Sequence, residues 1–164
     1  MTDEVDDIVA AWQRERPDLD VEPLQVLSRL DRLAGVLGER RRAIFAQHGL
    51  RGHEFDVLAA LRRAGAPFAL TAGELAARTY VTSGTMTSRL DGLVTRGLVT
   101  RAADREDGRL VRVTLTADGR QIVDAAFQAL LAAERELLTP LSSETLGPLA
   151  ATLRTLLARA AAPE

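Results

Sequence analysis

The sequence contains no cysteine, which excludes disulfide bonds, thiolate metal sites and cysteine-based redox sensing. It also contains no lysine, so all 21 basic residues are arginines. Its two histidines, His48 and His53, have no paired carboxylates beside them, which predicts surface or packing roles and not a metal site. We therefore expect a protein without a metal ion or any other cofactor.

Long apolar runs are missing as well. No stretch of about 18 uninterrupted apolar residues occurs, which is the minimum expected of a membrane-spanning helix. The chain begins with the acidic stretch "MTDEVDD", the opposite of the basic start of a signal peptide. We therefore expect a cytoplasmic protein with no membrane partner. Its 164 residues, of which 46% are hydrophobic, suffice for one folded domain with a hydrophobic core.

Patterns typical of an enzyme are also absent from the sequence. No nucleophile is paired with a base, and no glycine-rich loop is placed to hold a phosphate. Three acidic residues, Asp104, Glu106 and Asp107, lie in a turn that the sequence predicts to be mobile and solvated, which does not suit catalysis. We therefore expect that the protein is not an enzyme.

The charges of the chain are unevenly distributed. A net charge of −2 argues against a protein that coats nucleic acid without selectivity. Acidic residues crowd the start of the chain, whereas a group of arginines falls within one segment: Arg89, Arg96, Arg101, Arg105, Arg109 and Arg112. The protein can therefore present a local basic face despite its acidic total.

Apolar residues at helical spacing predict a mainly α-helical protein. A short amphipathic helix is expected within residues 1–20, before the break "RPDLDVEP". One long helix is expected over residues 24–48. Further long helices are expected within residues 117–162, where Thr116 and Ser142 are candidate N-caps.

The middle of the chain, residues 50–116, predicts shorter elements. A helix over Gly52–Arg63 is followed by one that begins at the capping-box spacing of Thr71 and Glu74. The turn "YVTSGT" then leads into a further helix, capped by Thr82 or Ser83. Two short helices joined by a tight turn form a helix-turn-helix.

Two strands are expected after this helix-turn-helix. The run "LVTR" predicts the first, and the alternation of Val111, Val113 and Leu115 with polar residues predicts the second. The charged loop "AADREDG" joins them into a β-hairpin. A helix-turn-helix followed by a hairpin is a winged helix, in which one helix enters the major groove of DNA and the loop reaches the backbone or minor groove.

The side-chain types on this helix and wing predict which residues contact DNA. Candidates for phosphate and base-edge contacts lie on the second helix of the pair: Ser83, Thr85, Thr87, Ser88 and Arg89, with partial packing as the alternative role of Thr87. Arg109 suits the minor groove, and Arg105 and Arg112 suit phosphates. We expect Asp107 to hold the guanidinium of Arg109 in one orientation through a charge-assisted hydrogen bond. The alternative is a solvated, charged turn without a DNA contact.

Two stretches resemble the MarR family of transcriptional regulators. The stretch "DGRLVRVTLTADG" resembles the family's wing, with its Asp-x-Arg loop and Val-x-Leu-Thr strand end. The stretch "VTSGTMTSRLDGLVTRGLVTR" resembles the family's recognition helix and first wing strand, and the likeness extends over residues 27–157. It implies a mainly α fold with a small β-hairpin wing, organised as a single domain over residues 1–164.

The resemblance also implies partners and a function. Such a protein is a homodimer that binds a pseudo-palindromic operator in double-stranded DNA, here as a repressor, through intertwined helices within residues 24–48 and 117–162. Independently, the apolar stripes of these helices exceed what a small winged-helix lobe can cover, so dimerisation would bury them. A winged-helix module that binds another protein is the alternative, and salt-dependent binding to duplex DNA distinguishes the two.

A ligand site is implied by the same resemblance. Family members that respond to urate and related compounds carry an added N-terminal helix and residues similar to Trp12, Asp56, Arg63 and Arg89. Arginines pair with a planar anion, an indole covers its ring, and an aspartate accepts a ring N–H. If Arg89 also contacts DNA, ligand binding and DNA binding are coupled.

Other interpretations of these four residues remain open. Trp12 can pack within the fold, and Asp56 and Arg63 can be ordinary surface residues. Arg89 can serve DNA alone. The anion itself can be a urate-like purine or a small carboxylate, since a carboxylate needs the arginines but not the tryptophan.

Overall fold

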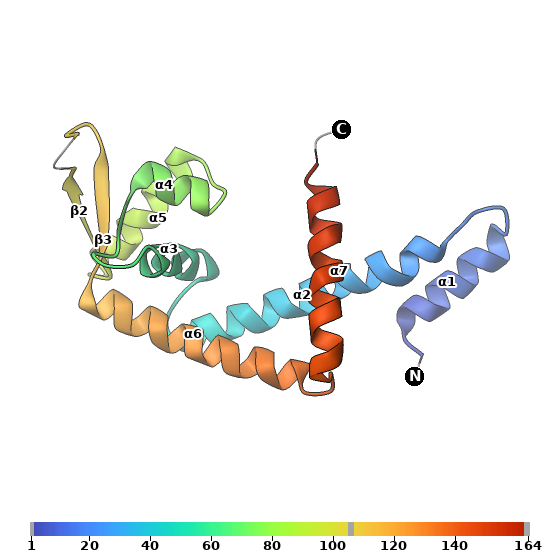
Figure 1. Cartoon of the computed structure of the whole chain (residues 1–164). Helices are drawn as coiled ribbons and strands as arrows, with labels where there is room; N and C mark the ends of the chain where they lie inside the picture. Colours follow the sequence, from blue (N-terminus) through green and yellow to red (C-terminus); the bar gives the residue numbers. More distant parts are fainter. Residues whose placement is uncertain (1, 105–106, 163–164) are drawn as a thin grey trace. The chain divides into compact units, whose positions relative to one another are not determined.

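The computed structural model describes residues 2–104 and 107–162. Its elements in chain order are α1 (Glu4–Glu15), α2 (Glu22–Gln47), α3 (Gly52–Arg63), β1 (Ala69–Thr71), α4 (Ala72–Arg78), α5 (Ser83–Thr95), β2 (Val99–Ala103), β3 (Val111–Leu115), α6 (Ala117–Leu138) and α7 (Ser143–Ala160) (Figure 1). The mainly α architecture with a β-hairpin, predicted from the sequence, is confirmed. The chain divides into two compact units, and the boundary between them follows Ala126.

Helix α1 is an appended element that packs on the first half of α2. Asp3 caps it by accepting hydrogen bonds from the amides of Val5 and Asp6. Val5 and Val9 are buried with Val21, next to the partly buried Leu24. Arg29 of α2 adds ion pairs to Asp3 and Asp6 at 2.8 and 2.7 Å. The apolar spacing that predicted this helix therefore corresponds to one buried face.

Trp12 follows Val5 by seven residues and so lies on the same face of α1. Its side chain nevertheless remains 49% exposed, so packing within the described chain covers only part of it.

A winged-helix lobe follows the end of α2. Gly49 ends the helix with a φ of 65°, and Phe45 of α2 stacks on Phe55 of α3 with ring centroids 4.1 Å apart. The lobe's core contains fully buried side chains from α3, α4, α5, β2 and β3: Val57, Leu58, Leu61, Leu75, Met86, Leu90, Leu93, Val99 and Val113. The apolar stripes predicted on these helices thus meet in one core.

Three antiparallel strands, in the order β1-β3-β2, complete the lobe. The strands β2 and β3 form the predicted hairpin, with Arg101 opposite Val113. The sequence prediction missed β1, which pairs the buried Leu70 with Val113. A strand of three residues is too short to produce a detectable alternation.

Side-chain caps begin the helices around the lobe as predicted. Thr71 and Glu74 form the capping box of α4, and Thr82, not Ser83, caps α5 by accepting a hydrogen bond from the amide of Thr85. Thr116 caps α6 by accepting a hydrogen bond from the amide of Gly119 at 3.0 Å. A Cβ at Gly119 would collide with the carbonyl oxygen of Leu98, the residue before β2, so only glycine fits at this point of α6.

The second unit contains the end of α6 and the whole of α7. Ser142 precedes α7, but its hydroxyl lies 3.0 Å from that of Thr145 and makes no capping bond to a backbone amide. Several of this unit's large apolar side chains are exposed: Phe127, Leu138, Leu141, Leu149, Leu156 and Leu157. Within the part of the chain that the structure describes, no helix is long and apolar enough to cross a membrane.

Candidate nucleic-acid interface

Helix α5 separates an apolar face from a polar one. Met86, Leu90 and Leu93 are buried in the lobe. The residues predicted to contact DNA lie away from these, since Ser83, Thr85, Thr87 and Ser88 are exposed and Arg89 is half-buried. Thr87 is therefore not packed in the core, and its hydroxyl donates a hydrogen bond to the carbonyl of Ser83. A helix of this kind offers hydroxyl groups and a guanidinium to a partner surface.

Arg101 of β2 attaches α5 to the wing. Its Nη1 forms an ion pair with Oδ1 of Asp91 at 2.6 Å, and its Nη2 donates a hydrogen bond to the carbonyl oxygen of Thr87 at 2.9 Å. Among the described residues, its buried Nε has no hydrogen-bond partner. Both contacts are to α5, so this side chain links the wing strand to the helix. Sequence spacing gives no signal for this link, because it depends on the packing of β2 against α5.

Arg96 attaches the other end of α5 to the start of α3. It donates hydrogen bonds to the buried carboxylate of Glu54 at 3.0 Å and to the carbonyl of Gly49 at 2.8 Å. Burial raises the pKa of Glu54, but the amide of Arg51 and the guanidinium of Arg96 outweigh it, and the pKa lies below its usual value. This carboxylate therefore stabilises the fold at neutral pH, and its contribution is lost as the pH falls through the lowered pKa.

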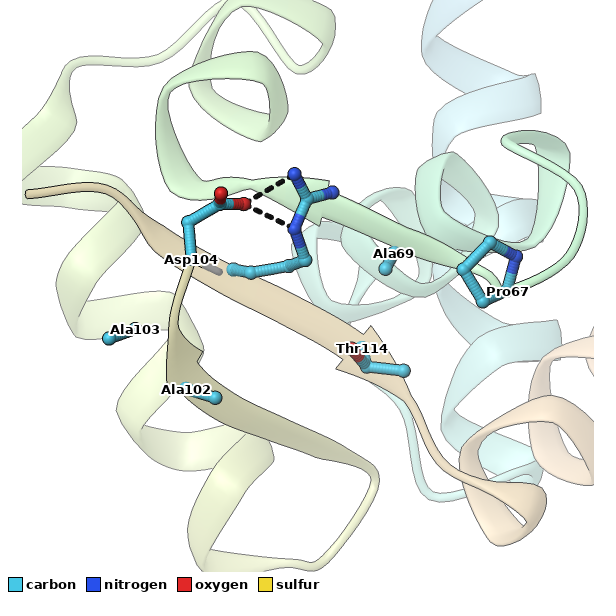
Figure 2. Close-up of a pocket in the computed structure, with 7 residues that line it drawn as sticks. Pro67, Ala69, Ala102, Ala103, Asp104 and Thr114 are labelled. Carbon is cyan, nitrogen blue, oxygen red and sulfur yellow. Dashed lines mark hydrogen bonds and ion pairs between the residues drawn. The ribbon is translucent and has the colours of Figure 1, made fainter. Parts of the chain in front are cut away.

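The wing is anchored by Asp104, whose side chain is only 4% exposed. Oδ2 of the carboxylate is paired with both Nε and Nη2 of Arg112 (Figure 2). Oδ1 accepts a hydrogen bond from the amide of Asp107. The backbone amide of Asp104 donates to the carbonyl of Leu110 at 2.9 Å. The expectation that Asp104 lies in a solvated turn is therefore wrong, because its carboxylate is buried and paired with the guanidinium of Arg112.

Asp107 and Arg109 form the described part of the wing turn. Oδ1 of Asp107 accepts a hydrogen bond from the backbone amide of Arg109 at 3.0 Å. Asp107 therefore orders the backbone of the turn, and the expected bond from the guanidinium of Arg109 to its carboxylate remains a prediction. Arg109 itself is exposed at the turn. Arg105, predicted to contact phosphates, lies outside the described residues.

Arg112 was also predicted to contact phosphates. Its guanidinium pairs with Asp104, while 43% of its side chain remains exposed. The phosphate contact of Arg112 therefore remains a prediction, since the exposed part of the side chain can still meet a phosphate while the pair holds.

Replacing Asp104 with alanine is expected to lower the free energy of unfolding by about 1–3 kcal/mol, the usual cost of leaving buried or charged hydrogen-bonding groups without a partner. The variant removes both the ion pair to Arg112 and the acceptor of the Asp107 amide. Urea denaturation at pH 7 measures the loss.

A matched control for this variant is Asp124→Ala, which breaks the ion pair between Asp124 and Arg62. Both of these side chains are 41% exposed. An exposed pair contributes at most about 1 kcal/mol, so the control should lose less. Equal losses from the two variants would contradict the anchoring role of Asp104.

Two of the residues predicted to bind a ligand, Asp56 and Arg63, lie on α3, and a third, Arg89, lies on α5. Partial burial raises the pKa of Asp56, while the charges of Arg89 and Arg63, followed by those of His53 and Arg41, act to lower it. Asp56 therefore lies within electrostatic reach of both predicted arginines. We call these three charged residues the charged cluster, and binding of a ligand to it remains a prediction.

Trp12 does not join this cluster within the chain. Helix α1 is held against the first half of α2 by Arg29, whereas α3 follows the other end of α2 (Figure 1).

A separate cavity of about 620 Å³ lies over the sheet of the lobe (Figure 2). Small side chains line it, among them Ala69, Ala102 and Thr114, and Asp104 and Arg112 stand at one side. Because these two charges satisfy each other, the cavity offers little specific recognition to a ligand.

Comparison with known proteins identifies the architecture. A family model described as the MarR family matches residues 48–110, which include α3, α4, α5 and β2. The HTH-type transcriptional regulator PecS of Dickeya dadantii (strain 3937) is 38% identical over 141 residues, which cover 86% of this chain and 85% of that protein.

Solved structures agree with this. A MarR family protein from Bacillus stearothermophilus superposes with a TM-score of 0.73 at 26% identity, covering 88% of this chain and 99% of that one. A mutant MarR from E. coli, solved in complex with operator DNA, has a TM-score of 0.65 at 26% identity, and the match covers 85% of this chain and 99% of that one. Proteins of this kind are DNA-binding regulators and not enzymes, as expected from the sequence. From its likeness to PecS over most of both chains, and from its winged-helix lobe, the chain belongs to the MarR family of transcriptional regulators.

Proposed function

We propose that this regulator represses transcription by binding a pseudo-palindromic operator as a homodimer, and that a small anionic ligand weakens this binding. The observation that carries the proposal is the exposed polar face of α5, a helix that Arg101 links to the wing. The E. coli MarR of similar fold, solved with operator DNA, supports the same mode of binding.

In the proposed complex α5 lies in the major groove. Its exposed residues then contact phosphates and base edges: Ser83, Thr85, Thr87, Ser88 and Arg89. Arg109, exposed at the wing turn, enters the minor groove, whose negative potential favours arginine. Arg105 and the exposed part of Arg112 contact phosphates of the flanking backbone.

Exposed apolar side chains support the homodimer. Helix α2 carries Val26, Leu27, Leu33 and Val36 in exposed positions, in addition to the exposed side chains at the end of α6 and on α7. Exposing this much apolar surface to water is unfavourable, and a second copy of the same surface would bury it. The dimer would then place two winged-helix lobes on the two halves of one operator.

The ligand is proposed to bind at Asp56, Arg63 and Arg89. Two arginines suit an anion, either a urate-like purine or a small carboxylate, and the carboxyl of Asp56 suits a ring N–H of the purine. Trp12 would complete the site only where a second copy brings its α1 to the cluster. Because Arg89 also lies on α5, an occupied site would compete with DNA for the same guanidinium.

Operator binding is tested by a band-shift titration on the intergenic DNA upstream of the gene, repeated over a series of salt concentrations. Neutralisation of phosphates makes the affinity fall steeply with salt, so we expect a straight line of negative slope in a plot of log affinity against log salt. Excess unrelated duplex serves as the competitor. Binding that depends on neither salt nor sequence would instead favour the protein-interaction module.

Replacing Asp56 with asparagine is expected to remove the effect of urate on operator binding. The same change should raise the free energy of unfolding at pH 7, because the raised pKa means that ionising this carboxyl is unfavourable in the folded state. The gain should vanish at acid pH, where the carboxyl is protonated in both folded and unfolded chains. Thermal unfolding at the two pH values and band shifts with and without urate measure these effects.

Asp31, an exposed acid on α2, provides the matched control through Asp31→Asn. This variant should respond to urate as the unmodified protein does. If Asp56→Asn keeps the full urate response, the proposed ligand site is wrong.

A further inference from the structure

Tyr80, in the turn between α4 and α5, is an unusual residue for its position. Its side chain is 96% exposed, the highest value of any large hydrophobic side chain in residues 2–104 and 107–162. Its backbone has a φ of 53°, in the left-handed region that favours glycine and disfavours residues with a Cβ. The turn therefore holds an aromatic ring in water at a backbone position where glycine would be more stable.

The place of Tyr80 in the lobe suggests what the ring contacts. It precedes Thr82, the N-cap of α5, by two residues, and the exposed Ser83 and Thr85 lie in the first turn of that helix. Figure 1 shows α4 and α5 next to each other in the lobe. In a helix-turn-helix the first residues of the recognition helix contact base edges, while the preceding helix crosses the DNA backbone. A side chain in the turn between these two helices continues the proposed DNA-binding face toward that backbone.

We propose that Tyr80 contacts DNA at the edge of the major groove, where its hydroxyl donates a hydrogen bond to a phosphate oxygen and its ring covers the adjoining sugar. Tyrosine is one of the side chains that bind phosphates in this way, and it offers a large contact area with few rotatable bonds. This inference rests on the proposed operator binding and adds a contact outside α5 and the wing.

An uncharged contact has a distinctive dependence on salt. Removing an arginine that pairs with a phosphate makes the salt dependence of binding less steep, because fewer counterions are released. Removing the Tyr80 hydroxyl should lower the affinity at every salt concentration and leave the slope unchanged. The slope therefore distinguishes a lost neutral contact from a lost charge.

Two variants test the proposal. Tyr80→Phe keeps the ring and the backbone and removes only the hydroxyl, so we expect operator affinity about 3- to 10-fold weaker with an unchanged salt slope. Tyr80→Gly removes the side chain and fits the positive φ, so we expect a larger loss of affinity, about 5- to 30-fold, together with an equal or higher melting temperature. Opposite changes in binding and stability cannot arise from damage to the fold.

Each other outcome overturns the proposal. If the unmodified protein binds the operator and Tyr80→Phe binds equally well, the hydroxyl makes no phosphate contact, while the proposed operator binding stands. If Tyr80→Gly lowers both the melting temperature and the affinity, Tyr80 has a structural role instead. If the unmodified protein shows no sequence-specific binding, the proposed function fails, and this inference fails with it.

Discussion

Replacing Arg109 with alanine is expected to weaken operator binding by about 1–3 kcal/mol, which corresponds to about 5- to 150-fold. The exposed guanidinium stands on a turn whose backbone Asp107 orders, and Asp104 anchors that turn to the sheet. Because the turn is held independently of the Arg109 side chain, the substitution should leave the fold intact. A band-shift titration at constant salt measures the loss of affinity.

A matched control removes one positive charge far from the wing. Arg14, whose side chain is 70% exposed on α1, serves through Arg14→Ala. This control should bind the operator nearly as well as the unmodified protein. The Arg109 variant should keep its circular dichroism spectrum, and unchanged affinity in that variant would contradict the minor-groove assignment.

Placing aspartates at Leu149 and Leu156 together is expected to convert the dimer into a monomer and to weaken operator binding by about 10²- to 10⁴-fold. The two exposed leucines lie seven residues apart on α7, so they share one face of the helix. Charges there oppose burial of that face against a second copy. A monomer then binds a single half-site without the gain that a linked second lobe provides, a gain of about 10²- to 10⁴-fold. Sedimentation and band-shift titrations measure the two effects.

The opposite face of α7 provides the control for this experiment. Ala151 and Thr155 are exposed there, and changing both to aspartate adds the same charge. We expect this control to remain dimeric and to bind the operator. A double leucine variant that still sediments as a dimer would show that this face of α7 is not part of the interface.

Most helices could be predicted from the sequence because their signals are local. Apolar spacing and a capping residue lie within a few positions of each other, as in the box formed by Thr71 and Glu74. The strand β1 could not be predicted in this way. Its three residues form a strand only because Leu70 meets Val113 across a long stretch of chain.

The polar contacts of the lobe were harder to predict than its elements. Asp104 and Arg112 are eight positions apart, and they meet only in the register that the hairpin adopts. The contacts of Arg101 depend on how β2 packs against α5. Charged residues in a loop and on a strand therefore look solvent-exposed in the sequence, although the folded chain pairs them.

The candidate ligand residues also differ in how far their positions follow from local sequence spacing. Asp56 and Arg63 are seven residues apart and so lie on one face of α3. The likeness to the family pointed to Arg89, which lies within electrostatic reach of Asp56. The position of Trp12 depends on how α1 packs on α2, which residue spacing within α1 does not determine. That these four residues form one ligand site therefore remains a prediction.

The two arginines that link α5 to its neighbours also affect how this helix can move. Arg101 fastens the helix to the wing strand, and Arg96 fastens its far end to Glu54. A helix linked to its neighbours at two points moves together with the lobe. In the proposed complex, each lobe would bind its half-site as one unit. To bind an operator whose half-sites are shifted by half a helical turn of DNA, the two copies would have to move relative to each other.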